Sequence, residues 1–93
     1  MIIVSQDKAT IVNFESIQNI KIEPYGTHIK GKKIYKIFSG NFEGYETELG
    51  TYETEERAKE VLQEIITRYE SWENMKVGQP SGLCIPVYRM PED

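Results

Sequence analysis

The chain has 93 residues, a formal net charge of −4, and ordinary apolar and charged fractions of 39% and 28%. This predicts a single domain, residues 1–93, and argues against disorder. The negative charge disfavours nucleic acid or an acidic membrane as a partner of the whole molecule. The apolar opening of four residues is too short for a signal peptide or a membrane span, and Cys84 has no cysteine to pair with. We therefore expect a soluble cytoplasmic protein.

The first third of the chain predicts three strands. Ile2 to Ser5 and Thr10 to Phe14 are β-branched runs, and the polar residues between them predict a hairpin turn in which Asp7 binds nearby backbone. Asn19 to Pro24 alternates between apolar and polar residues, which is typical of a half-buried strand. Pro24 either ends this strand or confines it to a sheet edge.

Two further strands are expected before residue 53. Residues 25–32 contain two glycines and predict a loop. Lys33 to Phe38 is apolar on both faces, which favours a central strand. Residues 40–44 predict a turn that leads into a fifth strand, Tyr45 to Tyr52. Gly50 within that strand indicates a bulge or a close backbone contact.

One amphipathic helix is predicted from about Thr54 to about Trp72. Thr54 is a suitable N-cap, because its hydroxyl can accept a hydrogen bond from an unpaired backbone N–H. Two oppositely charged pairs are spaced four residues apart on the polar side: Glu55 with Lys59, and Glu64 with Arg68. Apolar residues recur at three- and four-residue steps and form one stripe: Ala58, Val61, Leu62, Ile65, Ile66, Tyr69 and Trp72.

These elements predict an α+β fold, a five- or six-stranded, mainly antiparallel sheet packed against one long helix. Leu83 to Met90 is the candidate sixth strand, and Pro86 restricts it to a sheet edge. A partial barrel and a pleckstrin-homology-like roll closed by a helix are the alternative arrangements of the same elements. Tyr69 and Trp72 either cover the core or remain available to a partner.

The sequence holds one basic cluster. Basic groups with aromatic residues between them can bind phosphates and stack bases, whereas lysines at a strand edge also keep a sheet soluble. We favour the second interpretation, because the cluster contains no arginine for bidentate phosphate binding. Its members are Lys30, Lys32, Lys33 and Lys36, with His28 and Tyr35 between them.

No residue is assigned as catalytic, cofactor-binding or metal-binding. We interpret His28 as a solvated loop residue, since no metal ligand lies at a suitable spacing. Cys84 has apolar neighbours that would raise the pKa of its thiol, which favours a buried filler over a nucleophile. Glu46 and Glu48 belong to a dense acidic stretch that we interpret as a solvated face.

Three segments resemble small uncharacterised proteins of Gram-positive bacteria and their phages. The first is the opening Met1 to Lys8, the second runs from Leu49 to Leu62, and many such proteins end in a stretch similar to Val87 to Glu92. The resemblance covers about half the chain. It implies a phage or mobile-element setting and a fold of β-sheet plus helix, and it implies no activity.

The leading functional hypothesis is a small non-enzymatic accessory protein that acts as a protein-interaction module, with a protein partner or a second copy of itself. Nucleic-acid binding through the basic cluster is the alternative. An enzyme using Glu46, Glu48 or His28 is the weakest hypothesis, because a thin core leaves little room for a water-excluding site. The candidate interaction surface is Lys30, Lys32, Lys33, Tyr35, Lys36, Val87 and Tyr88.

Overall fold

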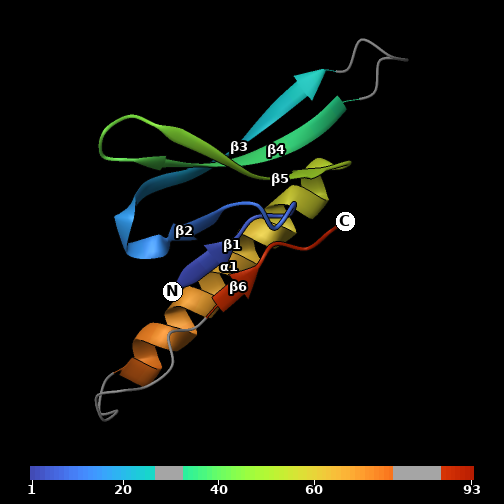
Figure 1. The fold of residues 1–93 in the computed structure, drawn as a ribbon. Helices are drawn as coiled ribbons and strands as arrows, with labels where there is room; N and C mark the ends of the chain where they lie inside the picture. The colour runs from blue at the N-terminus through green and yellow to red at the C-terminus, as the bar shows by residue number, and fades with distance from the viewer. Residues whose placement is uncertain (27–32, 77–86) are drawn as a thin grey trace.

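The computed structural model describes residues 1–26, 33–76 and 87–93 and shows an α+β fold (Figure 1). Within these residues, six strands and one long helix are present. The strands form two three-stranded sheets, one in the order β2-β1-β6 and the other in the order β3-β4-β5. The α+β class with one long helix is thus confirmed. The strands are divided between two sheets, whereas the sequence predicted one sheet of five or six strands.

The first sheet joins the two ends of the chain. Strands β1 (Ile2–Val4) and β2 (Ile11–Asn13) form the predicted antiparallel hairpin. The turn is closed by Asp7, whose Oδ1 accepts a hydrogen bond of 3.0 Å from the backbone N–H of Ala9. Strand β6 (Val87–Arg89) pairs with β1 in parallel. The last predicted strand is therefore confirmed as an edge strand, although residues 83–86 lie outside the described residues.

The second sheet is fully antiparallel and follows a short 3₁₀ turn at Phe14–Ser16. Its strands are β3 (Ile17–Gly26), β4 (Lys33–Asn41) and β5 (Glu46–Tyr52). The predicted central position of β4 is confirmed. The prediction of a loop from residue 25 is wrong for its first two residues, since β3 runs past Pro24. An edge strand tolerates this proline, because its missing N–H need not break a ladder bond.

A bulge in β5 confirms the interpretation of Gly50. Ile37 pairs with Gly50, but the next residue of β4, Phe38, pairs with Glu48, so Leu49 is an extra residue in β5. A Cβ atom at Gly50 would lie 3.0 Å from the ring of Tyr52. Glycine therefore provides the space that the Tyr52 ring occupies.

Helix α1 (Glu55–Lys76) begins where the sequence predicts and ends about one turn later. The cap is formed by Thr54, whose hydroxyl accepts a 3.0 Å hydrogen bond from the N–H of Arg57. The predicted Glu55–Lys59 ion pair is present at 3.0 Å. The other predicted pair does not form, because the carboxylate of Glu64 binds a tyrosine of β6 instead.

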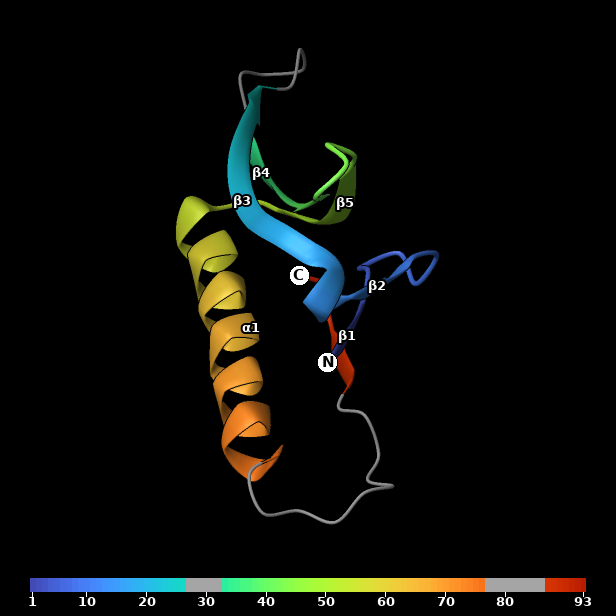
Figure 2. The same cartoon turned by 90° about the vertical axis from the view of Figure 1, so that its left-hand side faces the viewer.

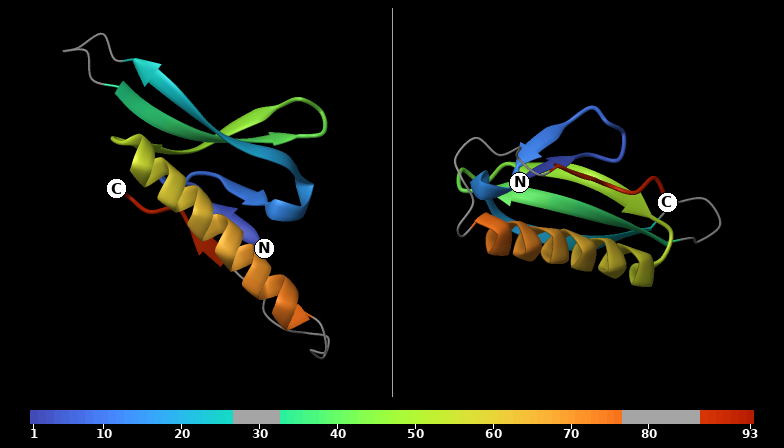
Figure 3. Two further views of the ribbon diagram at one scale, coloured as in Figure 1. Left: turned by 180° about the vertical axis from the view of Figure 1, so that it is seen from behind. Right: turned by 90° about the horizontal axis from the view of Figure 1, so that it is seen from below.

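The buried side of α1 packs against strands of the β3-β4-β5 sheet (Figures 2 and 3). Ala58, Val61 and Ile65 are fully buried, whereas Ile66 of the predicted stripe is 41% exposed. Further along the helix, Tyr69 is half-buried and its ring centroid lies 4.4 Å from that of Phe14. Tyr69 thus covers the end of the core. The core contains Met1, Ile3, Ile37, Leu49, Tyr52, Ala58, Val61, Ile65, Tyr88 and Met90.

Candidate binding groove between α1 and β6

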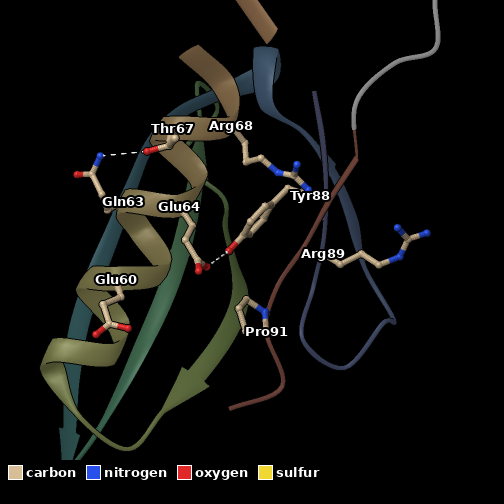
Figure 4. Close-up of a pocket in the computed structure, with 8 residues that line it drawn as sticks. All are labelled: Glu60, Gln63, Glu64, Thr67, Arg68, Tyr88, Arg89 and Pro91. Atoms are coloured by element: carbon tan, nitrogen blue, oxygen red, sulfur yellow. Dashed lines mark hydrogen bonds between the residues drawn. The ribbon is translucent and has the colours of Figure 1, made fainter. Parts of the chain in front are cut away.

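A groove of about 600 Å³ separates α1 from the carboxyl-terminal segment (Figure 4). This segment runs antiparallel to the helix, because Tyr88 contacts Glu64, whereas Asp93, further along the segment, contacts Arg57, which lies nearer the start of α1. The helix therefore forms one wall of the groove, and β6 together with Pro91 forms the other. The lining residues are Glu60, Gln63, Glu64, Thr67, Arg68, Tyr88, Arg89 and Pro91.

Tyr88 fixes the position of β6 relative to the helix. Strand alternation leaves Val87 and Arg89 exposed and buries Tyr88, which is only 6% exposed. Its hydroxyl donates a 2.7 Å hydrogen bond to Oε2 of Glu64. Burial, and then this bond to a carboxylate, raise the pKa of Tyr88 well above its usual range. The phenol thus keeps its proton at neutral pH and acts as a donor.

One edge of β6 is not paired with any strand of the described chain. The backbone N–H of Met90 donates to the carbonyl of Val4, which shows that this side of β6 faces β1. Successive peptide groups along a strand point in opposite directions, so the N–H and C=O groups of Val87 and Arg89 point away from β1. Since β6 ends the order β2-β1-β6, these groups face the edge of β6 that no described strand pairs with, which we call the open edge.

The helical wall of the groove is polar and carries both signs of charge. Its five residues recur at three- and four-residue steps, directly beside the buried stripe of α1. Glu60 is bound by Arg57 at 3.1 Å, whereas Arg68 has no ion pair within the described part of the chain. The sequence predicted only a solvated helix face here, because nothing in the helix itself reveals that β6 lies opposite.

The candidate surface residues that the structure describes fall on two different sheets. Val87 and Tyr88 lie on β6, and Lys33, Tyr35 and Lys36 lie on β4. Tyr35 is half-buried and packs against the core. Lys30 and Lys32 lie outside the described residues. The structure therefore does not bring the described members of the candidate surface together.

Lys36 is already engaged by neighbouring side chains. Its ammonium lies 2.8 Å from Oε1 of Glu48 and 4.9 Å from the centroid of the Tyr25 ring. The hydrogen bond to Glu48 is the main cause of the raised pKa of Lys36. A lysine neutralised in this way contributes little attraction for a phosphate backbone. The register of β4 against β5 thus brings basic and acidic residues onto one face.

A similar arrangement neutralises Lys21 on the same face. Its ammonium is 2.8 Å from Glu23 and 2.9 Å from Glu46, and these bonds raise its pKa above the usual range. The predicted position of Glu46 and Glu48 on a solvated face is confirmed, with side chains 45% and 46% exposed. His28 and Cys84 lie outside the described residues.

Among the described residues, no group of histidine, cysteine, aspartate and glutamate side chains is arranged to bind a metal ion. Within the same part of the chain, no helix is both long enough and apolar enough to cross a bilayer. Comparison with protein-family models, curated proteins and solved structures finds no match for the chain.

Proposed function

We propose that the chain is a small, non-catalytic protein-interaction module that adds an extended segment of a partner protein to the open edge of β6. The observation that supports this is the unpaired edge at Val87 and Arg89 beside a groove of about 600 Å³. In strand addition, backbone hydrogen bonds supply affinity, while side-chain contacts in a neighbouring groove supply specificity.

The short edge limits what the backbone alone can contribute. Two outward-facing residues offer four backbone hydrogen bonds, and each contributes about 0.5–1.5 kcal/mol net, so together they supply about 2–6 kcal/mol. A dissociation constant of about 1 μM requires about 8 kcal/mol. Pro91 has no N–H and cannot extend the ladder. Side chains of the partner must therefore contact the groove between α1 and β6.

The resemblance of the chain to small phage-associated proteins supports a setting in a phage or prophage of a Gram-positive bacterium, inside the cytoplasm. An interaction module of this size would act there as an accessory to a larger protein. The neighbouring genes provide an independent check. If they form a replication, packaging or lysogeny cluster, their products are the candidate partners.

A display library of random peptides, selected on the complete chain, tests strand addition directly. Val87→Pro removes one outward N–H and leaves the inward-facing groups of β6 in place. Val87→Thr is the matched control, because it retains the N–H and the β-branched shape. We expect selected peptides to lose about tenfold or more in affinity for V87P, corresponding to about 1.4 kcal/mol, and to bind V87T like the parent chain.

Circular dichroism and thermal melting show whether V87P remains folded. Equal affinity of the peptides for V87P and V87T would rule out strand addition at this edge. Sedimentation across a concentration series identifies the alternative occupant. If the chain forms a dimer that V87P abolishes, the edge of β6 binds a second copy instead of a partner segment.

A further inference from the structure

The turn between β4 and β5 presents two aromatic side chains to solvent. Phe42 is 74% exposed and Tyr45 is 70% exposed, which makes them the most exposed large hydrophobic residues of the described chain. Neither residue lines the groove between α1 and β6. Aromatic side chains are enriched at protein interfaces and dominate their energetics, so a pair of them on one turn indicates a contact surface.

The backbone of this turn is held in one conformation by Asn41. Its side-chain Oδ1 accepts 3.0 Å hydrogen bonds from the N–H groups of both Glu43 and Tyr45. Its own backbone N–H donates to the carbonyl of Tyr45, and its carbonyl accepts from the N–H of Gly44, whose φ of +92° suits glycine. The backbone that carries the aromatic side chains is therefore ordered before binding, which lowers the entropic cost of an interface.

The charges around the turn distinguish between the possible occupants. Glu43 is exposed and has no ion pair within the described residues, and residues 40–46 contain no lysine or arginine. The turn that carries the two aromatic residues is thus net negative. Like charges oppose contact with an anionic membrane or with the same turn of a second copy, whereas a basic surface is attracted.

We infer that Phe42 and Tyr45 form a second docking element, which inserts into an apolar pocket of a protein partner whose rim carries lysine or arginine. This surface is separate from the edge of β6 and does not depend on strand addition there. A chain with both surfaces contacts two proteins, or two parts of one protein, at the same time and therefore acts as an adaptor. The adaptor role thus rests on the proposed function as well.

Photo-crosslinking of the complete chain in its native host tests this inference. The probe is p-benzoylphenylalanine at position 42, and the matched control carries it in place of Tyr25, a 39% exposed aromatic residue of the same sheet. We expect one protein to be crosslinked from position 42 and not from position 25. Mass spectrometry should map the crosslink to an apolar pocket bordered by lysine or arginine.

Two variants separate the apolar and electrostatic contributions. Tyr45→Ser should lower the crosslinking yield from position 42 about tenfold or more, the loss expected of an interface anchor. Glu43→Lys should lower the yield as well, and the effect should weaken with added salt, because exposed charges are screened. Thermal melting shows whether each variant is folded. If one variant fails to fold, the crosslinking yield of the other still tests the inference.

Several results would overturn the inference. These are the absence of a protein crosslinked from position 42, a mapped site without a basic rim, and binding to phosphatidylglycerol vesicles that Phe42→Ser abolishes. Self-association that Phe42→Ser abolishes would assign the turn to a second copy. Val87→Pro should leave crosslinking from position 42 unchanged. Failure of this docking element is therefore distinguishable from failure of strand addition at β6.

Discussion

The side chain of Gln6 pairs with the backbone of Thr51 in the way that a neighbouring strand would. Its Oε1 accepts a 2.8 Å hydrogen bond from the N–H of Thr51, and its Nε2 donates a 3.0 Å bond to the carbonyl of the same residue. The backbone N–H of Gln6 also donates to the carbonyl of Leu49 at 2.7 Å. The turn after β1 thus covers part of the β5 edge and links the two sheets.

The first prediction concerns this link. The amide of Gln6 also donates to the carbonyls of Pro91 at 3.1 Å and Glu92 at 2.8 Å, so it joins three segments of the chain. Gln6→Ala should lower the free energy of unfolding by about 1–4 kcal/mol, since hydrogen bonds are lost and their partners remain unpaired. Urea denaturation measures the change. Gln18→Ala, at an exposed glutamine of β3, should change stability by less than about 0.5 kcal/mol. Equal effects of the two variants would contradict the proposed role of Gln6.

The second prediction concerns the bulge in β5. Gly50→Ala places a Cβ atom about 3.0 Å from the ring of Tyr52, which is buried and cannot easily move. Overpacking of this kind should lower the free energy of unfolding by about 1–3 kcal/mol. Gly26→Ala is the control, because a Cβ atom there has no neighbour within 4 Å. If both variants melt at the same temperature as the parent chain, a Cβ atom beside the Tyr52 ring does not destabilise the fold and the prediction is wrong.

Local features of this fold could be predicted from the sequence because neighbouring residues determine them. The Asp7 turn and the cap at Thr54 each depend on hydrogen bonds between residues two or three positions apart, and the structure confirms both. The bulge in β5 involves pairing with β4, but a glycine within a strand indicates it directly, and the structure confirms it as well. The apolar stripe of α1 was also predictable, except at Ile66. Ile66 lies between buried Ile65 and half-buried Tyr69, so its burial depends on how much of the helix circumference the sheets cover.

Features that depend on distant pairing could not be predicted. The division into two sheets follows from the pairing of β1 with β6, two segments at opposite ends of the sequence. The neutralisation of Lys36 depends on the register of β4 against β5, which places Glu48 beside it. The groove has the same origin, because a polar helix face becomes a wall only when β6 lies opposite. The sequence predicted the edge strand but gave no signal for the wall.

The third prediction concerns the start of α1. Thr54→Ala removes the acceptor of the hydrogen bond from the N–H of Arg57 and should lower the free energy of unfolding by about 0.5–2 kcal/mol. Thr54→Ser retains the hydroxyl and should preserve most of the stability. Urea denaturation measures the free energy of unfolding of both variants. A serine variant as unstable as the alanine variant would show that packing of the threonine methyl group, and not the cap, is responsible.

The fourth prediction concerns stability at high pH. Burial raises the pKa of Tyr52 to about 12, and burial together with Glu64 raises the pKa of Tyr88 further. In the unfolded chain both phenols titrate near the usual value of about 10. Above that pH the folded state therefore holds protons that the unfolded state releases, so the free energy of unfolding should fall as pH rises. Below about pH 9 both phenols are protonated in the folded and in the unfolded state. These two groups should therefore contribute no pH dependence to the free energy of unfolding there.

Matched phenylalanine variants isolate this effect from the lysines that titrate in the same range. Tyr52→Phe and Tyr88→Phe should each be less stable than the parent chain at neutral pH, because each removes a hydrogen bond. Each variant should also lose stability less steeply between about pH 9 and about pH 11, since one shifted phenol is absent. Urea denaturation across this range measures the slopes. Slopes parallel to that of the parent chain would mean that the phenols of Tyr52 and Tyr88 are accessible to solvent, and that β6 does not stay closed against α1.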